Sequence, residues 1–467
     1  MPERLSPLDA SFLFAEHRSA AMHVGAVMTF AQPVDGPFDP DAFSALIGER
    51  LALVPQYRRK LRAVPGGLGL PVWVDDPDFD LAFHVRRSAL PAPGGADILR
   101  ELVGRLLSRR LDRTRPLWEV YLVEGLAGGG FAVVTKTHHA MVDGLASIDI
   151  GTALLDPTPQ PRQTPPDRWA PAPEPSGLEL AASAAGEALR RPREALDQAG
   201  RAASDLGGAM ASVSRTVQGV VAAGRSAAGT RPLGSLNAPT GEQRRYGMVR
   251  TALADHRAVR RAHGGTVNDV VLAVVAGGLR RWLTDRGAPL PGGSAVRALV
   301  PVSVRARTRG GSADPPGNSI SACLLDLPVS EPDPVARLAA VRAAMAEQKR
   351  GGHAVAAAAL VGLAGLAPPV VHSLGVRLAS RYSSRIYNVL VTNVPGPPRP
   401  LYAMGARMLD LYPVVPLAGG QAVAVGVTTY DGAVHYGLTA DRDAAPDVDA
   451  LADALAGALA ELLATVD

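Results

Sequence analysis

Residues 157–237 differ in composition from the sequence on either side of them. From Asp156 to Pro175 the chain is rich in proline (DPTPQPRQTPPDRWAPAPEP), which favours an extended, solvated backbone. Residues 177–229 are rich in alanine, glycine and serine but have few large apolar side chains. A solvated linker helix is favoured there over a helix that lies on a membrane surface. We therefore predict an N-terminal domain of residues 1–156, a connector of residues 157–237 and a C-terminal domain of residues 238–467.

The two flanking parts alternate between strand-like and helix-like patterns. Runs of β-branched and other apolar residues predict strands at residues 22–30, 131–137, 297–304, 388–394 and 422–429. Apolar residues at helical spacing predict helices at residues 41–53, 98–111, 266–283 and 447–463. Alternating strands and helices of this kind are typical of an α/β fold.

Composition excludes several classes of protein. Hydrophobic residues make up 47% of the chain and charged residues 20%, which is typical of a globular protein that can bury a large core. The formal net charge is only +4 and no Lys/Arg run is interleaved with aromatic residues, so we expect no nucleic-acid partner. The single cysteine, Cys323, allows neither an internal disulfide nor a thiolate metal cluster, and it fits a reducing compartment.

The apolar segments indicate neither export nor a membrane span. Met1 to Phe14 lack a basic region followed by an apolar core, so we expect no signal peptide. The most apolar stretch, Ala354 to Val371, is interrupted by Pro368-Pro369, which makes it a poor transmembrane helix and favours a buried or interfacial one. We therefore expect a cytoplasmic protein, with peripheral contact to the inner face of the membrane as a further option.

The segment His138 to Gly144 (HHAMVDG) is the strongest candidate for chemistry. It follows a strand-like run and precedes a helical pattern. Consecutive residues of a strand point to opposite faces, so the two histidines cannot share one role. One of them can face a reaction channel, where a neutral imidazole could accept a proton from a hydroxyl nucleophile.

Several readings of the same segment stay open. Asp143 could orient a ring, pair with an arginine or cap the helix that starts at Gly144, and Gly144 itself would allow a tight turn. A metal site is less favoured, because the two histidines lack the i, i+4 spacing of a helical zinc site. The chain has no G-x-S-x-G elbow, P-loop or G-x-G-x-x-G fingerprint. Direct transfer to an acceptor is therefore favoured over a covalent acyl-enzyme.

The HHxxxDG pattern resembles the active-site motif of the CoA-dependent acyltransferase superfamily, which includes chloramphenicol acetyltransferase and the condensation domains of peptide synthetases. Over essentially its full length, the chain resembles more specifically the bacterial wax ester synthase/diacylglycerol acyltransferase family. The joint order and spacing of short motifs make this resemblance specific. In order along the chain, these motifs are Leu5-Ser6-Pro7-Leu8-Asp9 with Phe12-Leu13, Met22-His23-Val24-Gly25, Pro116-Leu117-Trp118-Glu119, His138 to Gly144, Asn268-Asp269, Val300-Pro301-Val302-Ser303, Gly317-Asn318 and Thr392-Asn393-Val394-Pro395-Gly396-Pro397.

The resemblance implies an architecture and an activity. Similar proteins have two layered α/β domains of the chloramphenicol-acetyltransferase type, with the active site in a tunnel between them. The resemblance implies that His139 is the general base beside His138 and that Asp143 is structural. It implies a fatty acyl-CoA co-substrate, a diacylglycerol or long-chain alcohol as acceptor, and no permanently bound cofactor or metal. It further implies that Asn268 and Asp269 belong to the site.

Other assignments are less sharply defined. The motif Pro116-Leu117-Trp118 shapes either the acyl pocket or the fold, and Trp118 by itself suggests a core aromatic residue. The cations for the CoA phosphates could include Lys136, Arg244, Arg245 and Arg305, although each could instead be a solvated side chain. The alternative functions are another CoA- or carrier-dependent acyltransferase of the condensation type and a non-catalytic lipid-binding protein. Association with a membrane or a lipid droplet is compatible with each.

Overall fold

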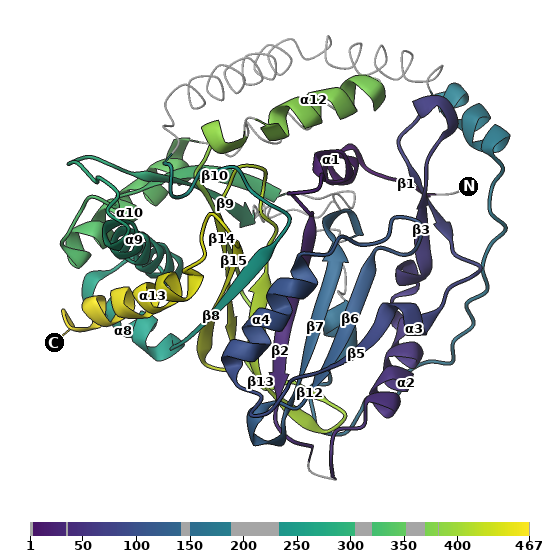
Figure 1. The fold of residues 1–467 in the computed structure, drawn as a ribbon, viewed down its shortest axis with the longest axis horizontal. Helices are drawn as coiled ribbons and strands as arrows, with labels where there is room; N and C mark the ends of the chain where they lie inside the picture. The colour runs from purple at the N-terminus through teal and green to yellow at the C-terminus, as the bar shows by residue number, and fades with distance from the viewer. Residues whose placement is uncertain are drawn as a thin grey trace, which may run out of the picture.

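Two six-stranded sheets lie side by side in the computed structural model, with helices on their outer faces (Figure 1). The structure describes residues 3–33, 36–141, 150–187, 233–303, 320–351, 369–381 and 383–466. The α/β prediction is thereby confirmed.

The first sheet combines strands from distant parts of the chain. In spatial order its strands are β12 (Tyr402–Ala403), β13 (Ala406–Val414), β2 (His23–Phe30), β7 (Phe131–His138), β6 (Trp118–Glu124) and β5 (Val85–Ala89). All neighbours are antiparallel except β5 and β6. Helix α2 (Pro40–Arg50) shares a core with one face, whereas α4 (Ala96–Leu107) shares a core with the other face and also contacts β8. Residues 402–414 therefore belong to a sheet that is otherwise built from the N-terminal part of the chain.

The second sheet is built from the C-terminal part of the chain. Its spatial order is β10 (Ile320–Leu327), β9 (Val296–Ser303), β11 (Val389–Val394), β14 (Val423–Tyr430), β15 (Ala433–Asp441) and β8 (Arg244–Ala252). Its outer face is covered by α8 (Leu253–His263), α9 (Val267–Asp285), α10 (Pro334–Gly351) and α13 (Val448–Leu463) (Figure 1). Helix α9 is apolar on nearly all sides because it packs between the sheet, α10 and α13.

Smaller elements surround the first sheet. A three-stranded sheet contains β1 (Glu3–Arg4), β4 (Val72–Asp75) and β3 (Arg59–Arg62). Further helices include α1 (Pro7–Ala15), α3 (Leu81–His84), α5 (Ile150–Leu154) and α12 (Pro369–Arg381), and the 3-10 turn η5 (His139–Met141) follows β7. Among the described residues, no helix is long and apolar enough to cross a membrane.

Most elements expected from apolar patterns are confirmed. The predicted strands correspond to β2, β7, β9, β11 and β14, and the predicted helices correspond to α2, α4, α9 and α13. Residues 161–176 have no regular secondary structure and are mostly exposed, whereas residues 177–187 form a helix. Within the apolar stretch 354–371, all but the last three residues lie outside the described part. The domain boundaries at residues 156 and 237 stay a prediction.

Two glycines let the sheets approach each other closely. Gly426 and Gly437 are directly paired on β14 and β15, and both face Pro413 of β13. A Cβ atom on Gly437 would lie 2.0 Å from the Pro413 carbonyl oxygen, and one on Gly426 would lie 3.0 Å from the Pro413 ring. The hydroxyl of Tyr246 on β8 donates to the same carbonyl at 2.8 Å. Because neither glycine has a side chain, β13 can pack directly against β14 and β15 at this point.

We expect Gly437→Ala to lower the free energy of unfolding by at least about 1–3 kcal/mol, because the added methyl group would overlap the Pro413 carbonyl of the neighbouring strand. Gly292→Ala is the matched control, since a Cβ atom there meets nothing within 4 Å. Urea unfolding of both variants measures the difference. Equal stability of the two variants would show that β13 can move away at no cost.

Candidate active site

The two adjacent histidines lie where β7 ends between its neighbours. The backbone N–H of His138 donates to the Leu117 carbonyl at 2.9 Å, and that of His139 donates to the Met22 carbonyl at 2.8 Å. These bonds fix the chain at the beginning of η5. The His138 side chain is only 1% exposed, whereas His139 is partly exposed. The neighbouring imidazoles therefore occupy different environments.

His138 is a buried, neutral imidazole. Its Nδ1 accepts a hydrogen bond from the Ala140 N–H at 3.0 Å, so the ring proton of the neutral form is on Nε2. Nε2 lies 3.9 Å from Oε2 of Glu16. Burial lowers the pKa of His138 to about 3, and electrostatic interaction with Arg113 and with the His139 ring acts in the same direction. Proton uptake at neutral pH is therefore not available to His138.

The carboxylate of Glu16 lies near this buried group. It follows α1 directly, and its side chain is 2% exposed. Oε2 accepts hydrogen bonds from Nε of Arg113 at 2.9 Å and from Nη2 of the same guanidinium. Oε1 lies 3.6 Å from Nε2 of His23. The Arg113 charge thus neutralises a carboxylate that faces two buried histidines.

His139 is held by an aromatic face. The ring of Phe12 stacks on it with centroids 3.8 Å apart and planes 19° apart. Burial lowers the pKa of His139, and the ring's own backbone carbonyl acts in the opposite direction. Its Nδ1 is buried without a hydrogen bond of standard geometry to a described residue. The neutral form, which can accept a proton, therefore dominates at neutral pH.

Helix α1 supplies both Phe12 and the anchor for Glu16. It begins with Pro7, after the Ser6 side chain accepts from the Asp9 N–H as N-cap. Ser11 Oγ hydrogen-bonds Nε2 of His372 on α12 at 2.9 Å, so α1 lies between η5 and α12 (Figure 1). The sequence motif around Ser6 supported only a family resemblance, and the contacts of Phe12 and Glu16 with the histidine pair were not predicted.

Asn268 and Asp269 have separate environments at the start of α9. Asn268 Oδ1 accepts from Nδ2 of Asn393, which lies on β11, at 2.9 Å. Asp269 Oδ2 accepts from the Thr266 N–H at 2.8 Å, and the Thr266 hydroxyl accepts from the Asp269 N–H, which makes a capping box. Asp269 is therefore a cap of α9. Contact of Asn268 with reacting groups stays a prediction.

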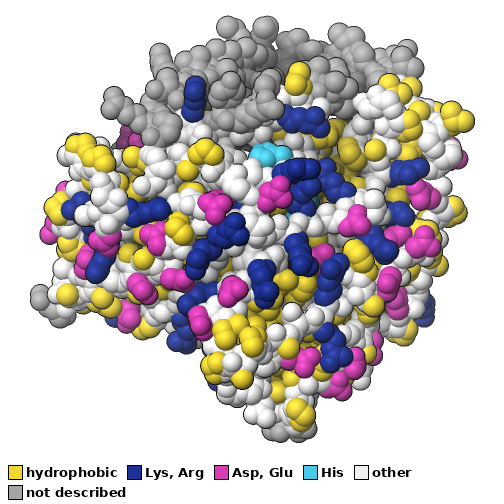
Figure 2. All heavy atoms as spheres, in the orientation of Figure 1, with side chains coloured by type: hydrophobic (Ala, Val, Ile, Leu, Met, Phe, Trp, Pro, Cys, Tyr) yellow, Lys and Arg dark blue, Asp and Glu magenta, His cyan; other side chains and the backbone are white. Residues whose placement is uncertain are grey.

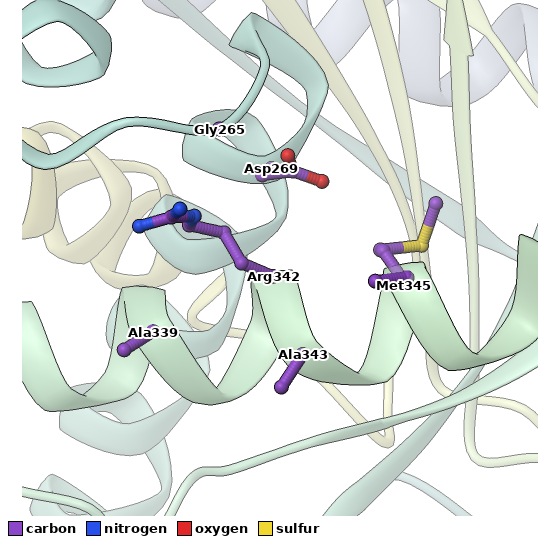
Figure 3. Close-up of a pocket in the computed structure, with 7 residues that line it drawn as sticks. Gly265, Asp269, Ala339, Arg342, Ala343 and Met345 are labelled. Atoms are coloured by element: carbon purple, nitrogen blue, oxygen red, sulfur yellow. The ribbon is translucent and has the colours of Figure 1, made fainter.

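Asp269 also lines a pocket of about 420 Å³ between α9 and α10. Figure 3 shows Asp269 on α9 and the Arg342 side chain on the facing helix α10, with Met345 further along α10. A second pocket, of about 490 Å³, lies at the opposite end of β2 from His23 and includes Phe30 and Asp410. Neither pocket is lined by His138 or His139.

The motif Pro116-Leu117-Trp118 supports the fold around the histidines. Trp118 is fully buried, its Nε1 donates to the Tyr57 carbonyl at 2.6 Å, and its ring stacks on His84. Leu117 is also fully buried, and its carbonyl accepts from the His138 N–H. Among the described residues, Trp118 thus contacts the core residues Tyr57 and His84, and Leu117 contacts β7.

Two of the candidate phosphate-binding cations are already paired. Lys136 is 1% exposed and lies 3.2 Å from a carboxylate oxygen of Glu119, its cross-strand partner. Arg244 is buried and lies 3.3 Å from Asp441. Neither is a solvated side chain, because each pairs with a buried carboxylate. Arg245 is 44% exposed and 3.7 Å from Asp449.

Three residues of interest, Asp143, Gly144 and Arg305, lie outside the described residues. The readings of Asp143 as a cap or an ion-pair partner therefore stay predictions. In the part of the chain that the structure describes, no three His, Cys, Asp or Glu side chains come together as metal ligands.

Comparison with known sequences identifies the family. The family model described as wax ester synthase/diacylglycerol acyltransferase catalytic domain matches residues 5–271, and the one described as WS/DGAT C-terminal domain matches residues 316–463. The chain belongs to the wax ester synthase/diacylglycerol acyltransferase family. A Mycobacterium tuberculosis H37Rv protein named "Probable diacyglycerol O-acyltransferase" is 36% identical, over 98% of this chain and 96% of that protein.

Solved structures agree with this family assignment. The wax ester synthase/diacylglycerol acyltransferase from Marinobacter aquaeolei VT8 superposes with a TM-score of 0.69 at 30% identity, covering 98% of both chains. The starter condensation domain of rhizomide synthetase superposes with a TM-score of 0.57 at 15% identity, covering 100% of this chain and 94% of the other, and shows the shared fold alone. The expected relation to condensation-type folds is confirmed.

The buried neutral state of His138 predicts acid sensitivity. Its pKa is about 3 in the folded state and about 6.5 when unfolded, so the unfolded state binds more protons between these values. Stability therefore falls as the pH drops below about 6.5, by up to about 1.4 kcal/mol per pH unit for this group. Urea unfolding between about pH 5 and 6.5 should show a shallower pH dependence for His138→Gln than for wild type. His263→Gln is the control, and identical slopes for His138→Gln and wild type would contradict the prediction.

Proposed function

We propose that this protein transfers a fatty acyl group from acyl-CoA to a hydroxyl of diacylglycerol or of a long-chain alcohol, giving triacylglycerol or a wax ester. The observation that carries the proposal is a neutral, partly exposed His139 in the HHxxxDG segment of a chain that belongs to this acyltransferase family. The names of the Mycobacterium and Marinobacter relatives support the same chemistry.

In the proposed mechanism, His139 accepts the proton of the acceptor hydroxyl. The oxygen then forms a bond to the thioester carbonyl carbon, and the carbonyl becomes a tetrahedral oxyanion. When this intermediate collapses, the carbon–sulfur bond breaks and the CoA sulfur leaves with the proton from the imidazolium. The proton is returned, so the base is regenerated without a covalent acyl-enzyme.

The surrounding residues support this role of His139. Phe12 restricts rotation of the ring by covering one face, while the backbone bond to Met22 fixes the Cα position. A positioned base contributes typically about 10²–10⁴-fold to rate. Asn268 is our candidate for polarising the acyl carbonyl, and its amide oxygen is already held by Asn393, which leaves its NH₂ group to donate.

Further parts of the proposal concern the acceptor and its access. A tunnel between the two sheet-containing domains would let an apolar alcohol meet the thioester while water is excluded. Asp143 is proposed to support the segment structurally. Peripheral contact with a membrane or lipid-droplet surface would supply the apolar acceptor.

Thiol release from palmitoyl-CoA, measured with hexadecanol or with diacylglycerol, tests the reaction. We expect release that depends on an acceptor, and we expect His139→Ala to lower kcat by about 10²–10⁴-fold without changing the melting temperature. His263→Ala is the matched control, since His263 lies on α8 and hydrogen-bonds Thr465. Equal turnover by wild type and His139→Ala would exclude His139 as the base, and lipid binding without any turnover would favour the non-catalytic alternative.

The lowered pKa of His139 also predicts the pH dependence of catalysis. Burial favours the neutral form, so the base stays unprotonated to lower pH than an ordinary imidazole does. We expect kcat/KM to fall on the acid side with a midpoint below about 6.5. A midpoint above that value would mean that another group controls the acid limb.

A further inference from the structure

Four exposed arginines near the histidine site have no anionic partner among the described residues. Arg18, Arg105, Arg109 and Arg110, which we call the arginine patch, are all exposed. Within the described residues, none of their guanidinium groups makes an ion pair or a hydrogen bond. Unpaired cations that lie close together form a surface that attracts anions.

Buried Arg244 brings the segments of this patch together. Its Nη2 donates to the Ser19 carbonyl at 2.6 Å, and its backbone N–H donates to Ser108 Oγ at 2.8 Å. Ser19 directly follows Arg18, and Ser108 directly precedes Arg109. The turn that carries Arg18 therefore lies next to the end of α4. Figure 2 shows Lys and Arg side chains across the middle of the visible face, with Asp and Glu side chains among them.

The dipole of α4 explains why some, but not all, of these arginines lie at these positions. Arginines in the last turn of α4 are stabilised by the negative end of the helix dipole, which accounts for Arg105. Arg110 lies beyond the helix, and Arg18 is on a different segment that the dipole does not explain. A bound anion would account for all of them together.

The patch borders the proposed active site. The Leu111 N–H, next to Arg110, donates to Nε2 of His23 at 3.3 Å. A few residues further on, Arg113 pairs with Glu16, whose carboxylate lies 3.9 Å from His138. Because Arg113 neutralises this carboxylate, Glu16 does not cancel the positive field of the patch.

We propose that Arg18, Arg109 and Arg110 bind the phosphate groups of the acyl-CoA donor. This inference rests on the proposed function. The 3′-phosphate and pyrophosphate of CoA are at the end remote from the thioester, so they require cations near the site but not in it. Guanidinium groups match phosphate oxygens with two parallel hydrogen bonds. The phosphate of an anionic lipid has the same chemistry, and the test distinguishes the two sources.

The test compares two double substitutions that remove the same charge. Arg109→Ala/Arg110→Ala alters the patch, whereas Arg260→Ala/Arg261→Ala alters two adjacent exposed arginines on α8. We expect the patch variant to raise the KM for palmitoyl-CoA about tenfold, in line with loss of a charge-assisted hydrogen bond, while kcat and the KM for the acceptor change little. The control should change none of these. Arg18→Ala should act in the same direction as the patch variant.

Calorimetric binding of CoA itself separates this inference from the proposed function. Wild type should bind CoA, and the Arg109→Ala/Arg110→Ala protein should bind about tenfold more weakly at an unchanged melting temperature. Equal CoA affinity of the two proteins would overturn the inference even if acyl transfer occurs. CoA binding without acyl transfer would instead overturn the proposed function and leave the phosphate site in place.

A vesicle assay addresses the lipid source. Cosedimentation with phosphatidylglycerol vesicles is compared with cosedimentation with phosphatidylcholine vesicles for the same proteins. An unchanged KM for palmitoyl-CoA, with loss of binding to the anionic vesicles alone, would assign the patch to a lipid surface and overturn the inference. Vesicle binding that does not change with the patch supports it.

Discussion

The hydrogen bond from the Ala140 N–H to Nδ1 of His138 determines how the two neighbouring histidines differ. By occupying the Nδ1 lone pair, it places the proton of neutral His138 on Nε2, toward Glu16. The same bond closes the turn after β7, from which the His139 ring extends. His138 is thus held as a buried imidazole, whereas His139 is partly exposed.

Helix α1 connects this turn to the rest of the molecule. Phe12 covers the His139 ring, Glu16 faces His138, and Ser11 hydrogen-bonds His372 of α12. Because Ser11 and Phe12 lie on α1 and Glu16 directly follows it, a shift of α1 would alter the surroundings of both histidines at once. The N-terminal sequence motif of the family therefore has a physical role at the site that its position in the chain does not suggest.

Local periodicity was sufficient to predict the helices and strands that carry the motifs, because burial of one face imposes a repeat of two or 3.6 residues. It was not sufficient for the pairing of β13 with β2, since long-range register is not encoded in a single strand's pattern. The burial of Lys136 was missed for a similar reason: its partner Glu119 is on another strand, and only the register places them opposite each other. The histidine motif was found from spacing alone, whereas Glu16 and Phe12 required the packing of α1.

The position of β13 has a consequence during synthesis of the protein on the ribosome. Strand β2 (His23–Phe30) is made well before its neighbour β13 (Ala406–Val414). Until then, one side of β2 has unpaired backbone groups, which are an open template for pairing with other chains. A nascent or truncated polypeptide that ends before β13 therefore exposes an unpaired sheet edge, and the solubility of the preceding part of the chain depends on a strand that is made much later.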